Sequence, residues 1–178
     1  MNDLAIINQS TVFIPDGLGR TFTALKLLEV MSSQLMFINR RNFVELTLLV
    51  DLRLDDNLLE TISYDVFWDL VNLQWLSLTR NRIKTLPENL LDKSSKFLWL
   101  TIDDNEIDVL DEKLLQNNLK VEMISMRRNK LKKINFTIDN FKNIAVVDLR
   151  GNLCIDTTSN KNQQTFENIQ NIIRFNCS

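Results

Sequence analysis

The sequence predicts an α/β solenoid of about seven coils, with a parallel β-sheet on its concave face and a capping helix at its C-terminus. The main observation is an apolar pattern that recurs every 24 residues. Each copy has apolar residues at its first, fourth and sixth positions and asparagine at its ninth. The four clearest copies begin at Leu49, Leu73, Phe97 and Val121. A repeat of this length is typical of solenoids, in which each coil buries its apolar side against the next.

The spacing of these apolar residues is that of the leucine-rich repeat. Upstream, a further copy begins at Leu25 and has Ser33 in the asparagine position, while Leu4 and Ile6 mark a weaker, partial first coil. Downstream, a last copy begins at Ile144 after a loop that is one residue shorter. The repeat therefore extends over nearly the whole chain.

Each copy predicts one strand followed by a bend. A strand alternates its faces, so Leu52 and Leu54 point into the solenoid while Asp51, Arg53 and Asp55 point out. A short amide side chain both donates and accepts, so stacked asparagines can satisfy buried backbone groups in the bends. The asparagines expected in this ladder are Asn57, Asn81, Asn105, Asn129 and Asn152.

The limb that returns to the next strand also carries a repeated apolar column. Its members are Phe43, Phe67, Leu91 and Leu115. A second column, three residues later, is apolar at Leu46 and Leu70 but is interrupted by Ser94 and Asn118. Looser loops are expected in the two coils that contain these polar residues.

The solenoid is expected over residues 1–153 and a C-terminal cap over residues 154–178. The only two cysteines, Cys154 and Cys177, bracket this cap. Between them, residues 165–175 predict a helix with one apolar stripe that covers the end of the core. The stripe consists of Phe166, Ile169, Ile172 and Ile173. A disulfide would hold the far end of the helix and would imply an oxidising compartment. The alternative is two free thiols in a cytosolic protein.

Composition argues against several functional classes. The net charge is −2, which argues against a nucleic-acid partner, and no apolar run is long enough to span a membrane. The chain has no histidine and no phosphate-binding glycine loop, so we expect neither an enzyme nor a cofactor. The carboxylate pairs Asp55-Asp56 and Asp103-Asp104 lie two coils apart, roughly 10 Å, with Arg80 between them, so no shared metal site is expected.

The outward positions of the strands predict a partner-binding site on the concave face. Trp75 and Trp99 occupy the same position on adjacent strands, next to Met123, and aromatic residues of this kind are enriched at interface hot spots. The alternative is cross-strand tryptophan packing that only stiffens the sheet. The candidate binding residues are Trp75, Trp99, Met123, Asp51, Arg53, Asp55, Arg80, Asp103, Arg127 and Arg150. The charged members could orient a partner or could pair with one another across coils.

Two features resemble a known class. The 24-residue repeat with phenylalanine on the return limb is similar to extracellular leucine-rich-repeat proteins. The ending from Asp148 to Asp156, with one more cysteine after a short helix, resembles secreted leucine-rich-repeat proteins of insects, some of which act in innate immune recognition. Two departures are the missing N-terminal cysteine cap and a C-terminal cap with two cysteines instead of four. The resemblance implies secretion and a binding function, although the segment Met1-Asn2-Asp3 lacks the features of a signal peptide.

We therefore expect a non-catalytic, secreted recognition or adaptor protein that binds a protein partner on its concave face. One alternative is an intracellular, cytoplasmic scaffold or regulatory subunit with the same face. Another is a structural protein that self-associates through an uncapped N-terminal edge. Three glycosylation sequons occur, which is the number that chance gives, and only Asn135 is expected on an exposed loop where a glycan could be attached.

Overall fold

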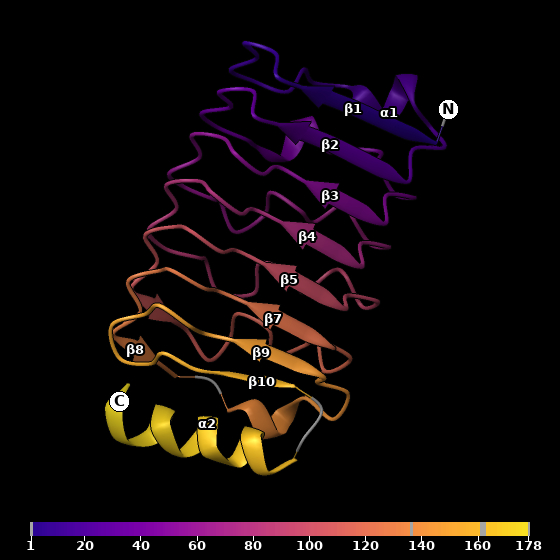
Figure 1. The fold of residues 1–178 in the computed structure, drawn as a ribbon. Helices are drawn as coiled ribbons and strands as arrows, with labels where there is room; N and C mark the ends of the chain where they lie inside the picture. Colours follow the sequence, from indigo (N-terminus) through magenta and orange to yellow (C-terminus); the bar gives the residue numbers. More distant parts are fainter. Residues whose placement is uncertain (1, 136, 161–162, 178) are drawn as a thin grey trace.

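The computed structural model describes residues 2–135, 137–160 and 163–177 and has the solenoid architecture that the repeats predict (Figure 1). Within these residues, seven parallel strands stack along one face of the solenoid, and an antiparallel strand, β10, completes the sheet. The strands, in spatial order, are β1 (Asp3–Ile7), β2 (Leu27–Met31), β3 (Asp51–Arg53), β4 (Trp75–Ser77), β5 (Trp99–Thr101), β7 (Met123–Ser125), β9 (Val146–Asp148) and β10 (Thr158–Asn160).

Short elements lie on the limbs between these strands. A second, two-stranded sheet pairs β6 (Val109–Leu110) with β8 (Lys133–Ile134). One short α-helix and two 3-10 helices, α1 (Leu18–Thr21), η1 (Arg40–Asn42) and η2 (Ile138–Asn140), follow the bends, and α2 (Gln163–Asn176) lies across the C-terminal end of the stack. The limbs run behind the sheet, so the outer side chains of the strands share one open face (Figure 1).

The register of the sheet follows the repeat length. Leu52, Leu76 and Leu100 are direct neighbours across β3, β4 and β5, 24 residues apart. The pairing of Met123 with Val146 spans 23 residues, as the shorter last loop predicts. These leucines are fully buried, so the core is a continuous apolar column along the solenoid axis.

The first coil is more complete than the sequence predicts. β1 is a full five-residue strand, and its pairing with β2 keeps the 24-residue register from Asp3 opposite Leu27 to Ile7 opposite Met31. The regular geometry continues just after this strand, where Asn8 adopts a positive φ of 56°. The residues spaced 24 apart from it along the chain also adopt a positive φ: Ser32, Asp56, Arg80, Asp104 and Arg128. The strand forms because the ladder requires only alternating faces, which residues 3–7 supply.

The asparagine ladder forms as predicted. The Nδ2 of Asn105 donates to the carbonyls of Leu78 and Asp103 at 2.9 and 3.1 Å, and its Oδ1 accepts from the backbone N–H of Ile83 at 2.9 Å. Each asparagine therefore joins its own bend to that of the preceding coil. The same arrangement occurs at Asn57, Asn81, Asn129 and Asn152.

The prediction of looser loops at Ser94 and Asn118 is wrong. Both side chains are buried: the Oγ of Ser94 donates to the carbonyl of Leu70 at 2.9 Å, and the Nδ2 of Asn118 donates to the carbonyls of Leu91 and Ser94. Hydrogen bonds between coils thus replace the apolar contacts of the neighbouring coils. Small polar side chains fit this column because backbone carbonyls of the preceding coil face them.

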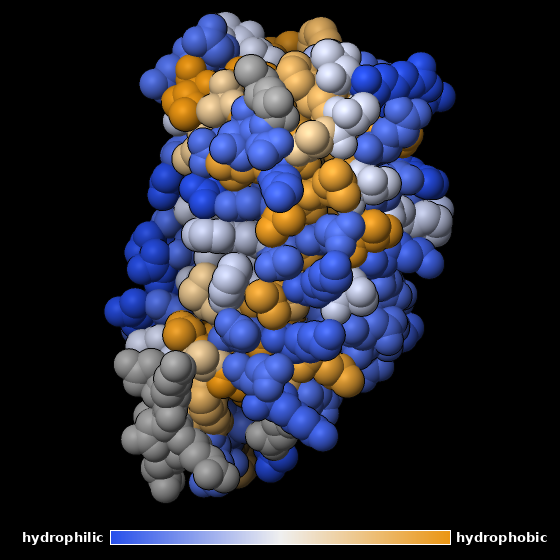
Figure 2. All heavy atoms as spheres, turned by 90° about the vertical axis from the view of Figure 1, so that its right-hand side faces the viewer, coloured by the Kyte–Doolittle hydropathy of each residue, from blue (hydrophilic) through white to orange (hydrophobic). Residues whose placement is uncertain are grey.

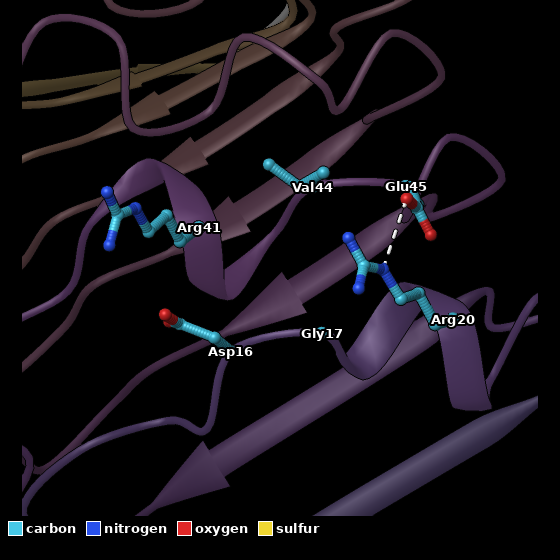
Figure 3. A pocket seen from close by; sticks show the side chains of 6 residues that line it. All are labelled: Asp16, Gly17, Arg20, Arg41, Val44 and Glu45. Carbon is cyan, nitrogen blue, oxygen red and sulfur yellow. Dashed lines mark hydrogen bonds and ion pairs between the residues drawn. The ribbon is translucent and has the colours of Figure 1, made fainter.

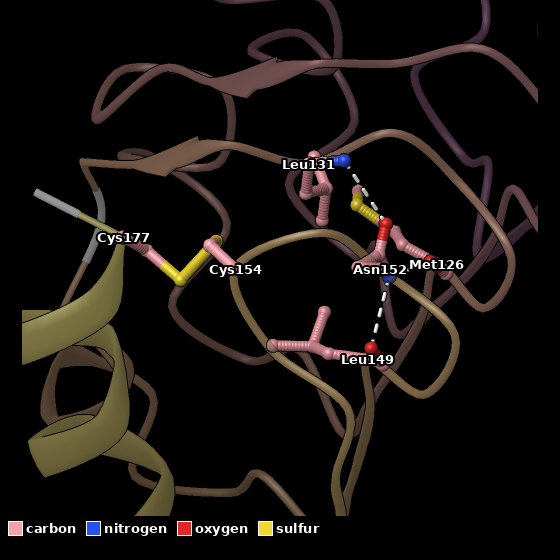
Figure 4. Close-up of a disulfide and its surroundings, with 6 residues drawn as sticks. All are labelled: Met126, Leu131, Leu149, Asn152, Cys154 and Cys177. Carbon is pink, nitrogen blue, oxygen red and sulfur yellow. Dashed lines mark hydrogen bonds between the residues drawn. A yellow bond between two sulfur atoms is a disulfide. The ribbon is translucent and has the colours of Figure 1, made fainter.

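The C-terminal cap contains the helix and the disulfide that the sequence predicts. Cys154 and Cys177 are bonded, with Cα atoms 5.2 Å apart, next to the last asparagine of the ladder (Figure 4). Ile169 and Ile173 of α2 are buried against the core, and the Oε1 of Gln170 accepts from the backbone N–H of Ile138 at 2.8 Å. The helix therefore covers the core beyond the last coil. The sequence did not predict β10, which pairs antiparallel with β9 between the last coil and this helix.

Candidate functional site

The sheet face, defined as the surface of outward side chains on the parallel strands, carries the aromatic row that the repeat register predicts. Direct strand pairing places Trp75 of β4, Trp99 of β5 and Met123 of β7 side by side. Asp51 precedes them on β3 and Val146 follows them on β9. All five side chains are half-buried, so this row forms a semi-exposed strip across five strands.

The two tryptophans contact each other. Their ring centroids are 5.9 Å apart and the rings meet edge to face, which is one of the arrangements that aromatic pairs prefer. The guanidinium of Arg53 lies 4.4 Å from the ring centroid of Trp75 and also bonds the carboxylates of Asp51 and Glu29. Cross-strand packing therefore exists, and the tryptophans point less freely into solvent than the sequence predicts.

Two carboxylates expected to point outward are instead buried between coils. Asp55 is 9% exposed and Asp103 is 4% exposed. Asp55 accepts from the Oγ of Ser77 at 2.5 Å and from the backbone N–H of Thr79 at 2.7 Å. Asp103 accepts the equivalent hydrogen bonds from the Oγ of Ser125 and from the backbone N–H of Arg127. Each carboxylate thus clamps its coil to the next, because the following strand presents a hydroxyl and a free N–H at the right positions.

The burial of Asp55 affects its ionisation. Loss of solvent raises the pKa of this carboxyl above its ordinary value, although the hydrogen bonds from Ser77 and Thr79 act in the opposite direction. The Asp55 carboxylate is therefore held by hydrogen bonds within the chain, and its burial makes it poorly placed to bind a cation of a partner protein.

The rim beside these carboxylates consists of ion pairs between successive coils. Both Nε and Nη2 of Arg80 donate to Asp56, at 2.5 and 2.6 Å, and Arg128 bonds Asp104 in the same way at 2.5 and 2.7 Å. These hydrogen bonds lower the pKa of the Asp56 and Asp104 carboxyls. Pairing across coils, one of the two possibilities that the sequence leaves open, is therefore present here: Arg128 bonds Asp104 and Arg80 bonds Asp56, each on the preceding coil.

The remaining arginines of the predicted site are also paired within the chain. Arg127 donates to Asp103 at 2.8 Å and lies 3.8 Å from Asp148, and Arg150 donates to Asp148 at 2.6 Å. Together with the Arg53 cluster, these contacts neutralise the charge bands of the sheet face from within. Within the described residues, the members of the predicted site that make no ion pair are Asp55, which Ser77 and Thr79 hold by hydrogen bonds, and the apolar side chains Trp75, Trp99 and Met123.

Asn135, the predicted glycosylation residue, lies directly after β8 and is exposed. Its backbone N–H donates to the carbonyl of Leu110 at 2.9 Å, which fixes the chain at this point while the side chain stays accessible. The middle residue of the sequon, Phe136, lies outside the described residues.

A hollow on the first two coils, which the sequence did not predict, is lined by side chains of both coils (Figure 3). Its volume is about 340 Å³, and its lining residues are Asp16, Gly17, Arg20, Arg41, Val44 and Glu45. The Nε of Arg20 lies 3.4 Å from Glu45, and both side chains are largely solvated. The mixed charges lining the hollow favour no single class of ligand.

The edge of the solenoid at which the strands begin is mostly hydrophilic, with apolar groups at intervals (Figure 2). Leu48, Val71 and Leu119, which precede β3, β4 and β7, are exposed there. Single exposed apolar residues are common on soluble proteins. Within the described residues, no helix is long and apolar enough to cross a membrane, and no cluster of three potential metal ligands occurs.

Comparisons with known proteins agree with the repeat architecture. Residues 8–83 match the leucine rich repeat family. The comparison with curated proteins gives no match. Among solved structures, a chain of the TLR13–ssRNA13 complex matches with a TM-score of 0.78 and 24% identity over 85% of this chain and 22% of that chain.

A chain of the LRIM1/APL1C complex matches with a TM-score of 0.77 and 19% identity, over 82% of this chain and 27% of that chain. This protein thus spans less than a third of the length of either structure, and at such identities the likeness concerns the fold. The repeat register, the asparagine ladder and these matches together identify the described chain as a leucine-rich-repeat solenoid.

Proposed function

We propose that this protein is a non-catalytic recognition or adaptor module that binds a protein partner on its sheet face. The observation that carries this proposal is the row formed by Trp75, Trp99 and Met123 across three adjacent strands. The leucine columns already fill the core, so the fold does not require two tryptophans at outward positions. Tryptophan side chains supply large contact areas and are enriched among interface hot spots.

The ion pairs of the sheet face indicate the chemistry of the partner. Arg53, Arg127 and Arg150 each bond a carboxylate of this chain, so a charged partner would have to displace an existing pair. An apolar or aromatic segment of a protein, laid along the tryptophan row, would bury surface without that cost. Binding should therefore depend weakly on salt, in contrast to binding of a nucleic acid.

A buried donor adds support. The indole N–H of Trp75 is buried and has no hydrogen-bond partner in the described part of the chain. An unpaired buried donor is unfavourable, and a backbone carbonyl of a partner that reached this indole N–H would satisfy it while Arg53 keeps its ion pairs. The partner segment would thus present both an apolar side chain and an accessible carbonyl.

The extracellular setting is part of the proposal. A disulfide between Cys154 and Cys177 is stable in oxidising compartments, and the C-terminal sequence resembles secreted leucine-rich-repeat proteins. A role in innate immune recognition follows from that resemblance. An intracellular scaffold would use the same face but would keep its thiols reduced.

A crosslinking experiment tests the binding surface. A photoreactive amino acid at Met123, in the full chain, would be exposed to extracellular fluid of the natural source, and crosslinked proteins would be identified by mass spectrometry. The affinity of a purified candidate would then be measured for three variants. We expect Trp75→Ala and Trp99→Ala to weaken binding at least tenfold, a loss of about 1.4 kcal/mol, which exceeds the roughly 1 kcal/mol that most interface residues cost when truncated.

Trp68→Ala provides the matched control. Trp68 lies on a return limb, where its ring meets Tyr64 edge to face and Arg40 lies over it, away from the sheet face. This variant should bind as the wild type does. The proposal fails if the two sheet-face variants also retain full affinity, or if affinity falls steeply with salt as it does for polyanions.

A further inference from the structure

Apolar side chains form a strip along the solenoid axis on the sheet face. In successive coils, the residue directly before each strand and the first residue of the strand are half-buried. The strip crosses five strands, from β3 to β9, and only single polar residues interrupt it. This apolar strip consists of Val50, Trp75, Leu98, Trp99, Met123, Ala145 and Val146.

The backbone beneath the strip is already paired. β4, β5 and β7 each have a hydrogen-bonded neighbour on both sides, so their N–H and C=O groups are used within the sheet. An extended segment laid on the strip would leave its own backbone groups without partners where they face it, which is costly at a buried contact. An α-helix satisfies these groups internally. The strip therefore favours a helical partner over an extended one.

The spacing of the strip also fits a helix. Neighbouring strands lie about 4.8 Å apart, so one outward side chain follows another at this interval along the solenoid axis. Side chains on one face of a helix recur every turn, about 5.4 Å, whereas those on one face of an extended chain recur every ~6.6 Å. Because the coil spacing is closer to the helical turn, a helix aligned with the axis can set one apolar side chain against each coil.

The two ends of the strip differ in their hydrogen-bonding groups. At the β4 end, the buried indole N–H of Trp75 has no partner in the described residues. Beside it, Arg53 uses three of the five N–H groups of a guanidinium on neighbouring carboxylates, so two remain. At the β7 end, the half-buried side chain of Glu122 makes no hydrogen bond or ion pair within the part of the chain that the structure describes. One end therefore offers donors and the other an acceptor.

We propose that the strip binds an amphipathic α-helix of about three turns, aligned with the solenoid axis, with its C-terminal end over Trp75 and its N-terminal end beside Glu122. This inference rests on the proposed function and names the conformation and direction of the partner segment. The last four carbonyls of a helix lack partners, and here they accept from Arg53 and, after the ring turns toward them, from the indole N–H. The first four N–H groups donate to Glu122, whose charge also favours the positive end of the helix dipole.

A peptide selection tests the helix. The probe is a phage-displayed library of random peptides of about 16 residues, long enough for four helical turns, selected on the full chain. Counter-selection uses the double variant Trp75→Ala/Trp99→Ala, whose fold circular dichroism would verify. We expect the selected peptides to carry apolar residues at spacings of three and four and to gain helical circular dichroism on binding.

Two results of the selection overturn the helix. Apolar residues at every second position would identify an extended ligand and leave the sheet-face function standing. The second result is that no selected peptide depends on the two tryptophans. The affinity of the natural partner for Trp75→Ala and Trp99→Ala then decides the proposed function separately.

Crosslinking measures the direction of the bound helix. A photoreactive amino acid replaces Gln74 or Ala145, which directly precede β4 and β9. These strands are three spacings apart, about 14 Å, which corresponds to roughly 10 residues of helix but only about 4 of an extended chain. We expect crosslinks from position 74 to map about 10 residues C-terminal to those from position 145 on the selected peptide. The reverse order, or a separation near 4 residues, overturns the proposal.

Glu122→Gln tests the contact at the N-terminal end of the helix. The substitution keeps the size of the side chain and removes its charge, so it should weaken binding of the selected peptide about twofold to fivefold. Glu112→Gln, exposed on a return limb, is the matched control and should bind as the wild type does. A helix bound in reverse would place its negative end at Glu122, and Glu122→Gln would then strengthen binding. Unchanged or stronger binding by Glu122→Gln overturns the assigned direction.

Discussion

The guanidinium of Arg53 stacks on the indole of Trp75, with Cζ 4.4 Å from the ring centroid, while two carboxylates hold the same guanidinium. The contact links the charged and the aromatic parts of the sheet face. A cation that is already bonded to Asp51 and Glu29 is positioned on the ring without further loss of side-chain freedom. Arg53 therefore restricts the motion of the Trp75 side chain and also shields its ring from solvent.

A double-mutant cycle would measure this contact. We expect Arg53→Ala and Trp75→Leu to be non-additive, with a coupling free energy of about 0.5–1 kcal/mol at this partly exposed site. The measurement is the free energy of unfolding in urea for the wild type, both single variants and the double variant. Additive effects within error would mean that the stacking contributes no stability.

The asparagine ladder should be more important for stability than polar residues at the edge of the coils. Asn105→Ala leaves the buried N–H of Ile83 without its partner, which costs about 1–3 kcal/mol, and removes one of the two hydrogen bonds to the carbonyl of Leu78, which Asn81 still bonds. Asn72→Ala is the control, because Asn72 is half-exposed and water can replace its bond to Thr47. Urea denaturation should show a large loss for the first variant and under ~1 kcal/mol for the second. Equal losses would contradict this ranking.

Asp104 and Asp55 should affect the pH dependence of stability in opposite directions. The Arg128 bond lowers the folded pKa of Asp104, so the stability it contributes is present above the unfolded pKa of about 3.9 and is lost as pH falls through the folded value. Asp104→Asn should thus be less stable than the wild type at pH 7, and the difference should shrink toward pH 3. This exposed pair contributes under about 1 kcal/mol.

For Asp55 the sign is reversed. Burial raises its folded pKa, so the native state binds the proton more tightly and stability falls as pH rises from the unfolded pKa through the folded one. Asp55→Asn keeps an oxygen acceptor for Ser77 and removes the buried charge. It should be at least as stable as the wild type at pH 7, with a smaller difference at pH 3. Thermal unfolding between pH 3 and 7 measures the stability of both variants relative to the wild type. If this difference changes with pH in the same direction for the two variants, these assignments are contradicted.

The disulfide should stabilise the C-terminal cap. The bond closes a loop with a sequence separation of 23 residues, which corresponds to about 3 kcal/mol in the chain-entropy model. The double variant Cys154→Ser/Cys177→Ser should lose roughly this amount, and exchange of the α2 amides with solvent deuterium should speed up most. Intact mass after alkylation checks the bond in protein from its natural source. Two labels should be added only after reduction, and labelling without reductant would remove the support for an extracellular setting.

Much of the fold could be predicted because a solenoid places residues 24 apart next to each other. Leu52, Leu76 and Leu100 are neighbours in space for the same reason that they are equivalent in sequence. The tryptophan row follows from the same rule. By contrast, β10 has no such equivalent: Thr158-Ser159-Asn160 carries no apolar alternation, and it becomes a strand because the edge of β9 offers unpaired backbone groups.

The sequence by itself determined the register, and with it the buried columns, the asparagine ladder and the order of side chains on the sheet face. Only the tertiary structure decided which outward residues are accessible. Asp55 is an outward residue by alternation, yet Ser77 and Thr79 of the next coil draw it inward. Periodicity fixes the direction of a side chain at its backbone, whereas its final environment depends on the hydrogen-bond partners that the adjacent coil presents.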